Sequence, residues 1–350
     1  MKNDMKKALF IGGTGVISGA CVELALKKGF EVTLLNRGGK RAPDGVRVIT
    51  CDVNDEAGVI QSLTRNAFVG SKSALSNLAA DSYDVVADFV VFRPEQAERD
   101  MRIFAERCGQ YIFVSSTAAY QKPFGQPIIT ESTPLSNPYW QYARDKIACE
   151  QVLTEAYRNS GFPATIVRPS HTYNEKKVPV ALHGKNGSWQ ILKRIIDGKP
   201  VVVPGDGLTW WTLTFSADFA AGFVGLMGNP HAIGEAVHIT SDEKLTWNGV
   251  HELYGKLLGR KPAIANIASR TIAKFDPSFE GTLLGDKSNS VNFDNTKIKR
   301  LVPEFVAATR FDQGVSLAME YILTHKDAQV EDPEFDAFCD MIIEATGTPY

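Results

Sequence analysis

Residues 9–19 read LFIGGTGVISG, an apolar segment that leads into a glycine-rich turn and then into a helical pattern. The three glycines of the turn, Gly12, Gly13 and Gly15, have no Cβ, so backbone N–H groups can approach a phosphate closely there. The helix that we expect to begin near Val16 points the positive end of its dipole at the same place. The stretch therefore predicts a turn that holds the pyrophosphate of a dinucleotide. An ordinary strand-to-helix turn is the alternative that this motif alone leaves open.

Further short apolar segments follow the first one, with helical patterns between them. Such alternation predicts an α/β fold with a Rossmann-type, doubly wound parallel sheet, in which ligands bind at the carboxyl ends of the strands. The stretch 67–82 does not fit the alternation, and we expect an insertion or a lengthened helix there. The expected strands are 31–36, 46–51, 84–89, 111–115 and 164–168, and the expected helices include 94–107 and 140–158.

Beyond Pro169 the alternation loosens, and turn signals rich in glycine, asparagine and proline appear. We therefore expect a smaller, mixed α/β substrate-binding lobe that covers the cofactor. The expected division gives residues 1–173 and about 209–240 to the dinucleotide-binding domain, and about 174–208 and 241–350 to the lobe. The helical patterns of this second region lie near 187–197, 246–258, 311–325 and 332–346.

The composition is that of an ordinary globular protein, with 350 residues, 44% hydrophobic residues and a net charge of −2. This near-neutral charge disfavours binding to nucleic acid or to an anionic membrane. No apolar stretch is long enough to span a membrane, and the N-terminal residues leave no room for a signal peptide, so we expect a cytoplasmic protein. The five cysteines have no paired spacing, which predicts buried thiols rather than disulfides or a metal site.

Tyr142 and Lys146 are four residues apart, on one face of an expected helix. A phenol with a pKa of ~10 is a poor base at neutral pH. A lysine ammonium ~4 Å away would favour the phenolate by roughly 4 kcal/mol, or ~3 pKa units, at an effective dielectric of ~20. The pair would then serve in proton transfer. Tyr173 and Lys177 have the same spacing, but Tyr142 lies in the helix that follows the strand ending at Ser116, so we favour Tyr142.

With Ser116 at a strand end and Tyr142 in the next helix, the chain resembles the extended or atypical branch of the short-chain dehydrogenase/reductase superfamily, the NAD-dependent epimerase/dehydratase family. The resemblance implies that Tyr142 is the general acid/base. It implies that Lys146 holds the nicotinamide ribose and lowers the pKa of the tyrosine, and that Ser116 hydrogen-bonds the reacting oxygen. The resemblance spans most of the chain and rests on residues 12–15, Asp52-Val53, 115–120, 142–146, Arg168-Pro169, and 205–207 followed by Asp218.

The same resemblance implies a set of cofactor contacts and a mode of assembly. Asp52 would accept a hydrogen bond from the adenine amine. The helices at 94–107 and 140–158 would pair with those of a second copy in a four-helix bundle, giving a homodimer. The full set of expected cofactor contacts is Gly12, Gly13, Thr14, Gly15, Val16, Ile17, Asn36, Arg37, Asp52, Val53, Tyr142, Lys146 and Pro169.

Two departures from the family pattern concern the cofactor. Ser18 stands where the third glycine of the motif is usual, and it is small enough for close packing of the helix. An NAD enzyme would place a carboxylate at the end of the second strand, on the ribose hydroxyls, but Asn36 stands there. Arg37, with Lys40 and Arg41 behind it, offers positive charge where the 2′-phosphate of NADP would lie. We therefore favour NADP and keep NAD open, with a solvated cluster of loop charges as the alternative.

A third departure concerns the substrate. Sugar-nucleotide enzymes of this branch hold the diphosphate with an arginine shortly after the Gly-Asp-Gly turn, and Trp211 stands at that position. Trp210 and Trp211 could stack on a sugar or aromatic ring, although core packing of one of them is an equal alternative. Thr117 and His171 are the other expected substrate contacts, with purely structural hydrogen bonding as the alternative for each.

These observations predict an NAD(P)-dependent oxidoreductase or epimerase that transfers a hydride at a secondary alcohol or ketone carbon, of a sugar, sugar nucleotide or glycoside. Ala118 and Ala119 stand where dehydratases of the branch carry an Asp-Glu pair, which argues against dehydration. A non-catalytic nucleotide- or RNA-binding protein is the alternative, because the chain also resembles the chloroplast stem-loop-binding proteins and a fold does not fix a function. A redox-sensing regulator that binds the cofactor without turnover is a third possibility.

Overall fold

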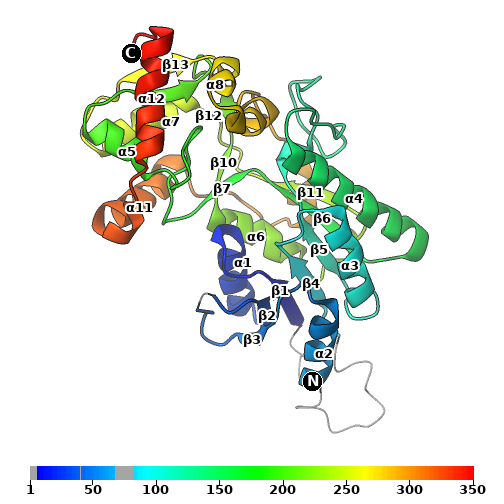
Figure 1. Ribbon diagram of the computed structural model, residues 1–350. Coiled ribbons are helices and arrows are strands. Elements are labelled where there is room, and N and C mark those ends of the chain that lie inside the picture. Colours follow the sequence, from blue (N-terminus) through cyan, green and yellow to red (C-terminus); the bar gives the residue numbers. More distant parts are fainter. Residues whose placement is uncertain (1–5, 40, 68–81) are drawn as a thin grey trace.

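The computed structural model describes residues 6–39, 41–67 and 82–350. Its centre is a seven-stranded sheet with the order β11-β6-β5-β4-β1-β2-β3, and every neighbouring pair is parallel (Figure 1). The predicted doubly wound α/β fold is thus confirmed. The strand order reverses between β1 and β4, and ligands of such sheets bind at that point. The strands are β1 (Lys7–Ile11), β2 (Glu31–Asn36), β3 (Arg47–Thr50), β4 (Val85–Asp88), β5 (Tyr111–Val114), β6 (Ala164–Pro169) and β11 (Ala236–Ile239).

Helices cover both faces of this sheet, because alternate residues of each strand point to opposite sides. On β1, Phe10 faces a core formed with helices α1 (Val16–Lys27) and α6 (Ser216–Leu226). Its neighbour Leu9 faces a second core, formed with the helices of the other side. These are α2 (Glu56–Ala67), α3 (Pro94–Phe104) and α4 (Gln141–Ser160).

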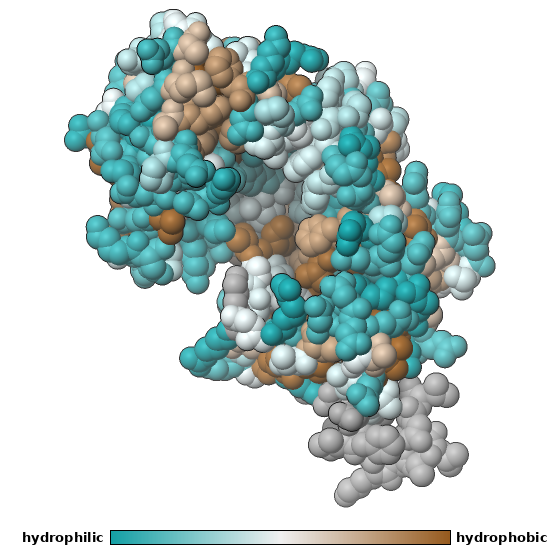
Figure 2. Space-filling model, in the orientation of Figure 1, coloured by the Kyte–Doolittle hydropathy of each residue, from teal (hydrophilic) through white to brown (hydrophobic). Residues whose placement is uncertain are grey.

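The C-terminal part of the chain forms a mixed lobe beside the carboxyl ends of the strands (Figure 1). Parallel and antiparallel pairs occur in it, β13 with β8 and β12 with β9. A hollow lies between this lobe and the sheet (Figure 2). The larger elements are α5 (Trp189–Ile196), β8 (Val201–Pro204), β9 (Trp210–Trp211), β12 (Leu245–Thr246), α7 (Trp247–Leu257), β13 (Ile264–Ile267), α11 (Phe311–Thr324) and α12 (Pro333–Thr346), and β7 (His171–Tyr173) pairs with β10 (Leu213–Phe215) between the two parts.

Helix α2 is one of the elements that the sequence pattern did not predict, as are α6 and β11. Its sequence is polar and contains a glycine, so the helical pattern is weak. Val59 and Leu63 form a short apolar stripe, and both are buried. The signal that could have revealed it is Asp55, whose carboxylate accepts a 3.0 Å hydrogen bond from the Gly58 N–H in the first turn. Of the expected insertion at 67–82, residues 68–81 lie outside the described residues.

Two further sequence expectations concern the cysteines and the membrane. All five cysteines are free thiols, and Cys21, Cys149 and Cys339 are buried as expected. Cys51 and Cys108 are only partly buried. Over the described residues, every helix is too short or too polar to cross a bilayer.

Candidate active site

The glycine-rich turn between β1 and α1 has the backbone that a phosphate cradle requires. Gly12 and Gly13 have φ angles of +104° and +61°, which residues with a Cβ rarely adopt. A Cβ on Gly13 would lie 2.5 Å from the Cδ2 atom of Leu34, which is fully buried. Ser18 takes the place of the third glycine: it is buried, and its Oγ accepts a 2.9 Å hydrogen bond from the Gly15 N–H. Serine here keeps the close packing and also fixes the turn.

A cavity of about 610 Å³ opens over this turn, at the carboxyl ends of the first strands. This volume lies within the ~300–1,000 Å³ of small-molecule and cofactor sites. Asn36 and Arg37 line it from the end of β2, and Asp52 lines it from the end of β3. The glycine turn, the open volume and the polar rim fit a dinucleotide. Of the expected cofactor contacts, this cavity is lined by Gly12, Thr14, Gly15, Asn36, Arg37, Asp52 and Val53.

The remaining expected cofactor contacts lie elsewhere. Gly13 and Val16 line an adjoining groove of about 490 Å³. Ile17 packs against the core beneath α1, and Pro169 ends β6. Lys40 lies outside the described residues, and Arg41 pairs with Asp44 at 3.4 Å on the surface.

Tyr142 and Ser116 come together in a second pocket, of about 310 Å³. Tyr142 lies in the first turn of α4, and Ser116 follows the end of β5. Burial raises the pKa of Tyr142 above its ordinary value, a hydrogen bond with Ser116 lowers that pKa, and the charge of Asp286 raises it. The Ser116 hydroxyl also accepts a 3.1 Å bond from the Ala118 N–H. The expected acid/base group and its hydrogen-bond partner are therefore adjacent.

Lys146 is anchored to two backbone carbonyl groups. Its ammonium is buried and donates hydrogen bonds to the carbonyl oxygens of Val91, at 2.6 Å, and Val114, at 2.8 Å. Nζ lies 5.8 Å from the centroid of the Tyr142 ring. Burial lowers the pKa of Lys146 to about 8. In this structure the pKa of Tyr142 is shifted by burial, by Ser116 and by Asp286. The expectation that Lys146 lowers this pKa and holds the nicotinamide ribose stays a prediction.

The second tyrosine with this spacing is excluded by its surroundings. The ring of Tyr173 packs edge-on against Phe215 and Phe311, with centroids 5.4 and 5.6 Å away. Its buried hydroxyl has no hydrogen-bond partner among the described residues. Tyr173 is therefore part of the core, and Tyr142 is the tyrosine that reaches a pocket.

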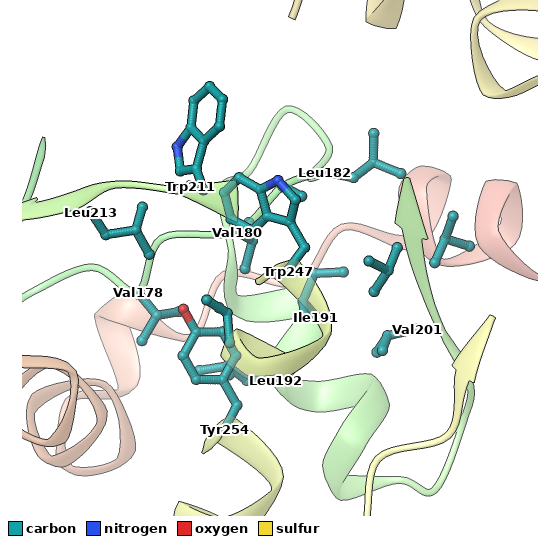
Figure 3. Packing of buried hydrophobic residues seen from close by; sticks show 14 of the residues in the cluster. Val178, Val180, Leu182, Ile191, Leu192, Val201, Trp211, Leu213, Trp247 and Tyr254 are labelled. Atoms are coloured by element: carbon teal, nitrogen blue, oxygen red, sulfur yellow. The ribbon is translucent and has the colours of Figure 1, made fainter. Parts of the chain in front are cut away.

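Two of the four expected substrate contacts reach the Tyr142 pocket. Thr117 and His171 line it. Trp211 is buried and stacks on Trp247 with 5.6 Å between centroids, so it packs in the core instead (Figure 3). Trp210 is 50% exposed, with the Lys244 ammonium 5.6 Å from its ring, and it lies outside the pocket. The tryptophan pair therefore has no place in the site.

The sequence matches a known protein family. A sequence profile described as the NAD dependent epimerase/dehydratase family matches residues 8–240. The chain belongs to this family. The expected family relationship is confirmed, and it indicates an NAD-dependent oxidoreductase or epimerase in general terms.

Two curated relatives and one solved structure illustrate the family's range. The chain is 26% identical over 264 residues to a 2′-dehydrokanamycin reductase of Streptomyces kanamyceticus, covering 74% of this chain and 68% of that protein. It is 27% identical over 259 residues to the chloroplast stem-loop binding protein of 41 kDa b of Arabidopsis thaliana, covering 73% and 64%. The UDP-glucose 4-epimerase of Thermus thermophilus, in complex with NAD, shares the fold at a TM-score of 0.67 and 20% identity, over 91% of this chain and 99% of that one.

Five residues that line the Tyr142 pocket were not foreseen from the family motifs: Trp140, Ser170, His183, Asp286 and Lys287. Trp140 directly precedes α4, so its position two residues before Tyr142 was the available signal. Asp286 and Lys287 lie about 140 residues further along the chain, and only the folded lobe brings them to the site. No group of three or more His, Cys, Asp or Glu side chains in the described ranges could hold a metal ion.

Proposed function

We propose that this protein is an NAD(P)-dependent oxidoreductase or epimerase that transfers a hydride at a secondary alcohol or ketone carbon of a carbohydrate-like substrate. The observation that carries this proposal is the contact of Tyr142 with Ser116 in a pocket beside the glycine-lined cavity. A phenol and a hydroxyl side by side can hold a substrate oxygen and exchange its proton. The relative that reduces 2′-dehydrokanamycin supports chemistry at a sugar carbon.

A nicotinamide bound in this cleft would accept or donate the hydride. The chain's own residues would do the rest. The Tyr142 oxygen would take the hydroxyl proton during oxidation and return it during reduction, and Ser116 would hold the same substrate oxygen in place. Lys146 fixes α4 to the loop after β4 and to the end of β5 through its contacts with the carbonyls of Val91 and Val114, and so positions Tyr142.

The end of β2 supports a preference for NADP. Asn36 uses its side-chain oxygen to accept a 2.8 Å bond from the Gly38 N–H, so it offers no carboxylate to a ribose diol. Arg37 is exposed, lines the cavity and has no ion-pair partner among the described residues. A guanidinium in this position suits a 2′-phosphate. NAD remains the cofactor that the family name and the solved relative indicate.

Assembly and location belong to the same proposal. The side-by-side packing of α3 and α4 on one face of the sheet supports a homodimer through these helices (Figure 1). The five free thiols support a reducing compartment such as the cytoplasm. The stem-loop-binding relative favours the alternative of an RNA-binding protein, whereas the net charge of −2 disfavours a phosphate-backbone binder.

The proposal is tested by purifying the protein and identifying the bound dinucleotide by native mass spectrometry. The second step is to mix the loaded protein with secondary alcohols and sugars and to follow reduction of the dinucleotide by absorbance. We expect a bound NADP and reduction by at least one sugar. Salt-dependent binding of RNA without any hydride transfer would favour the alternative instead.

A further inference from the structure

The Tyr142 pocket contains three titratable side chains that no protein group in the described part of the chain satisfies. His171, Asp286 and Lys287 all line it and are only partly exposed. In the ranges 6–39, 41–67 and 82–350, no hydrogen bond or ion pair joins any of these side chains to another residue. Polar groups withdrawn from bulk water almost always have a partner. Three unpartnered groups around one pocket therefore point to a ligand that supplies the partners.

The segment that carries two of them is a π-helical turn, Leu283–Lys287. Such turns are rare and often occur at functional sites. This one is fastened to the catalytic side of the cleft by Asn137, whose side-chain nitrogen donates to Gly285 O at 2.7 Å and to Ala118 O at 2.9 Å. The placement of the segment opposite Ser116 is therefore fixed by buried hydrogen bonds.

Close packing on Trp140 and Trp247 holds the same segment from two other directions. A Cβ on Gly285 would lie 2.9 Å from Cβ of Trp140, and a Cβ on Gly281 would overlap Cδ1 of that indole. The Trp247 indole N–H donates to Lys287 O at 3.2 Å. The backbone around Asp286 is thus held rigidly.

Trp140 itself gives the pocket an aromatic wall. Its ring lies 4.8 Å from that of Tyr142, centroid to centroid. An apolar ring face beside a carboxylate and an ammonium matches a sugar, which has an apolar C–H face and a rim of hydroxyls. A vicinal pair of hydroxyls can donate to the carboxylate and accept from the ammonium at the same time.

We propose that Asp286 and Lys287 hold two neighbouring hydroxyls of a sugar ring that packs on Trp140, so that the ring presents its reacting carbon to Tyr142. The substrate is then an unphosphorylated sugar or the terminal ring of a glycoside. This inference rests on the proposed function and names its substrate class.

The size and charge of the pocket favour this class over a sugar nucleotide. About 310 Å³ lies at the small end of the ~300–1,000 Å³ of ligand sites. Lys287 is the one lysine or arginine that lines it in the described part of the chain. Trp211, at the position where sugar-nucleotide enzymes of the branch carry an arginine, lies in the core. A diphosphate would therefore be poorly neutralised here.

The charge state of Asp286 allows its carboxylate to accept hydrogen bonds from sugar hydroxyls. Burial raises the pKa of Asp286 to about 6, against the opposing charges of Lys122 and Lys287. The carboxylate is thus ionised at neutral pH, facing Lys122, Lys287 and the Tyr142 phenol. Lys122 is engaged elsewhere: its Nζ donates to Tyr120 O at 3.3 Å and lies 4.0 Å from the centroid of the Phe124 ring.

The first test measures stability and needs no substrate. A carboxyl whose folded pKa is raised costs stability above that pKa and not below its ordinary pKa. Asp286→Asn should therefore have a higher Tm than the wild type at about pH 8, and this difference in Tm should disappear as the pH falls to about 4. Asp327→Asn, at an exposed site of the same lobe, is the matched control and should leave Tm unchanged at both pH values. A lower Tm of Asp286→Asn near about pH 8 would show a structural role and overturn the inference.

The second test measures substrate selection. Wild-type protein loaded with NADP⁺ is assayed with monosaccharides and methyl glycosides, and separately with UDP-hexoses. We expect turnover of an unphosphorylated sugar, with KM raised roughly tenfold or more in Asp286→Asn and in Lys287→Met, and kcat reduced less. Lys256→Met and Asp327→Asn, both at exposed sites, should keep wild-type KM.

The outcomes separate the two proposals. A preference for UDP-hexoses, or an unchanged KM in both pocket variants, overturns this inference and leaves the proposed function standing. If the wild type binds the dinucleotide but turns over none of these probes, the proposed function fails and this inference fails with it.

Discussion

The cofactor cavity and the Tyr142 pocket lie at the same edge of the sheet but hold their polar groups differently. In the cofactor cavity, Asn36 bonds Gly38 N at 2.8 Å and Asp52 bonds Asn54 N at 2.9 Å, each two residues along the chain. In the Tyr142 pocket, Asp286 has no such partner among the described residues and comes from the far lobe. The polar groups of the cofactor cavity are thus held by local hydrogen bonds. In the Tyr142 pocket, by contrast, we propose that a substrate supplies the partner of Asp286.

The largest expected effect lies on the substrate side. Tyr142→Phe removes the oxygen that exchanges the proton, so turnover should fall by about 10²- to 10⁴-fold while affinity for the dinucleotide stays nearly unchanged. Steady-state kinetics and a fluorescence titration of the dinucleotide measure the two quantities. Tyr173→Phe is the matched control, because it removes a buried hydroxyl without a partner in the described structure and should keep activity. Wild-type rates in Tyr142→Phe would refute the role of the phenol.

On the cofactor side, Gly13→Ala should cost about 2–5 kcal/mol of unfolding free energy. The positive φ costs ~1–2 kcal/mol and the contact with buried Leu34 ~1–3 kcal/mol. Urea unfolding measures the loss, and dinucleotide binding should fall with it. Gly19→Ala in α1 is the control, since its Cβ would meet nothing within 4 Å, and it should be neutral or stabilising. Equal stabilities of the two variants would remove the argument for a sterically required turn.

Lys146 links the two sides, and its removal should destabilise the protein. Lys146→Met leaves the carbonyls of Val91 and Val114 without their partner, at ~1–3 kcal/mol each, partly offset because no charge is then buried. The folded pKa of Lys146, about 8, lies below its ordinary value. The unfolded chain therefore binds more protons above about pH 8, and this group raises wild-type stability as the pH increases toward ~10.

The variant lacks that rise, so the difference in unfolding free energy between wild type and Lys146→Met should widen over this range. Urea unfolding at several pH values checks it, with exposed Lys256→Met as the control. A constant difference would mean that Lys146 titrates normally in the folded protein.

The smallest effect concerns the choice of dinucleotide. Arg37→Gln should weaken NADP binding by about 10- to 100-fold, the loss of a charge-assisted hydrogen bond, and leave NAD binding unchanged. Arg260→Gln, exposed on the far lobe, is the control. Equal effects of Arg37→Gln on both dinucleotides would argue that Arg37 makes no contact with a 2′-phosphate.

How far the sequence could predict this site follows from where its residues lie in the chain. The turn at Gly12–Gly15 and the helix after it are neighbours in sequence, so local pattern and glycine chemistry were enough. Tyr142 and Ser116 were found because their spacing follows a family pattern. Asp286 and Lys287 depend on the packing of Gly285 against Trp140 and on hydrogen bonds from Asn137. The hydrophobic periodicity that predicts helices and strands does not reveal such long-range contacts.

The Trp210–Trp211 pair shows that the sequence also could not tell which of two adjacent residues is buried. Trp210 and Trp211 are adjacent in the sequence, which does not show which indole is exposed. The stacking of Trp211 on Trp247 places Trp211 in the core (Figure 3). The direction of the Lys146 ammonium was also beyond sequence, because an i to i+4 spacing fixes a helix face and leaves the end of a long side chain undetermined.

The account is tested most directly by a crystal structure of the protein with NADP⁺. It predicts adenosine between Arg37 and Asp52, pyrophosphate over the glycine turn, and the C4 atom of the nicotinamide facing the Tyr142 oxygen across the 310 Å³ pocket. A dinucleotide bound elsewhere, or a nicotinamide turned away from Tyr142, would contradict it.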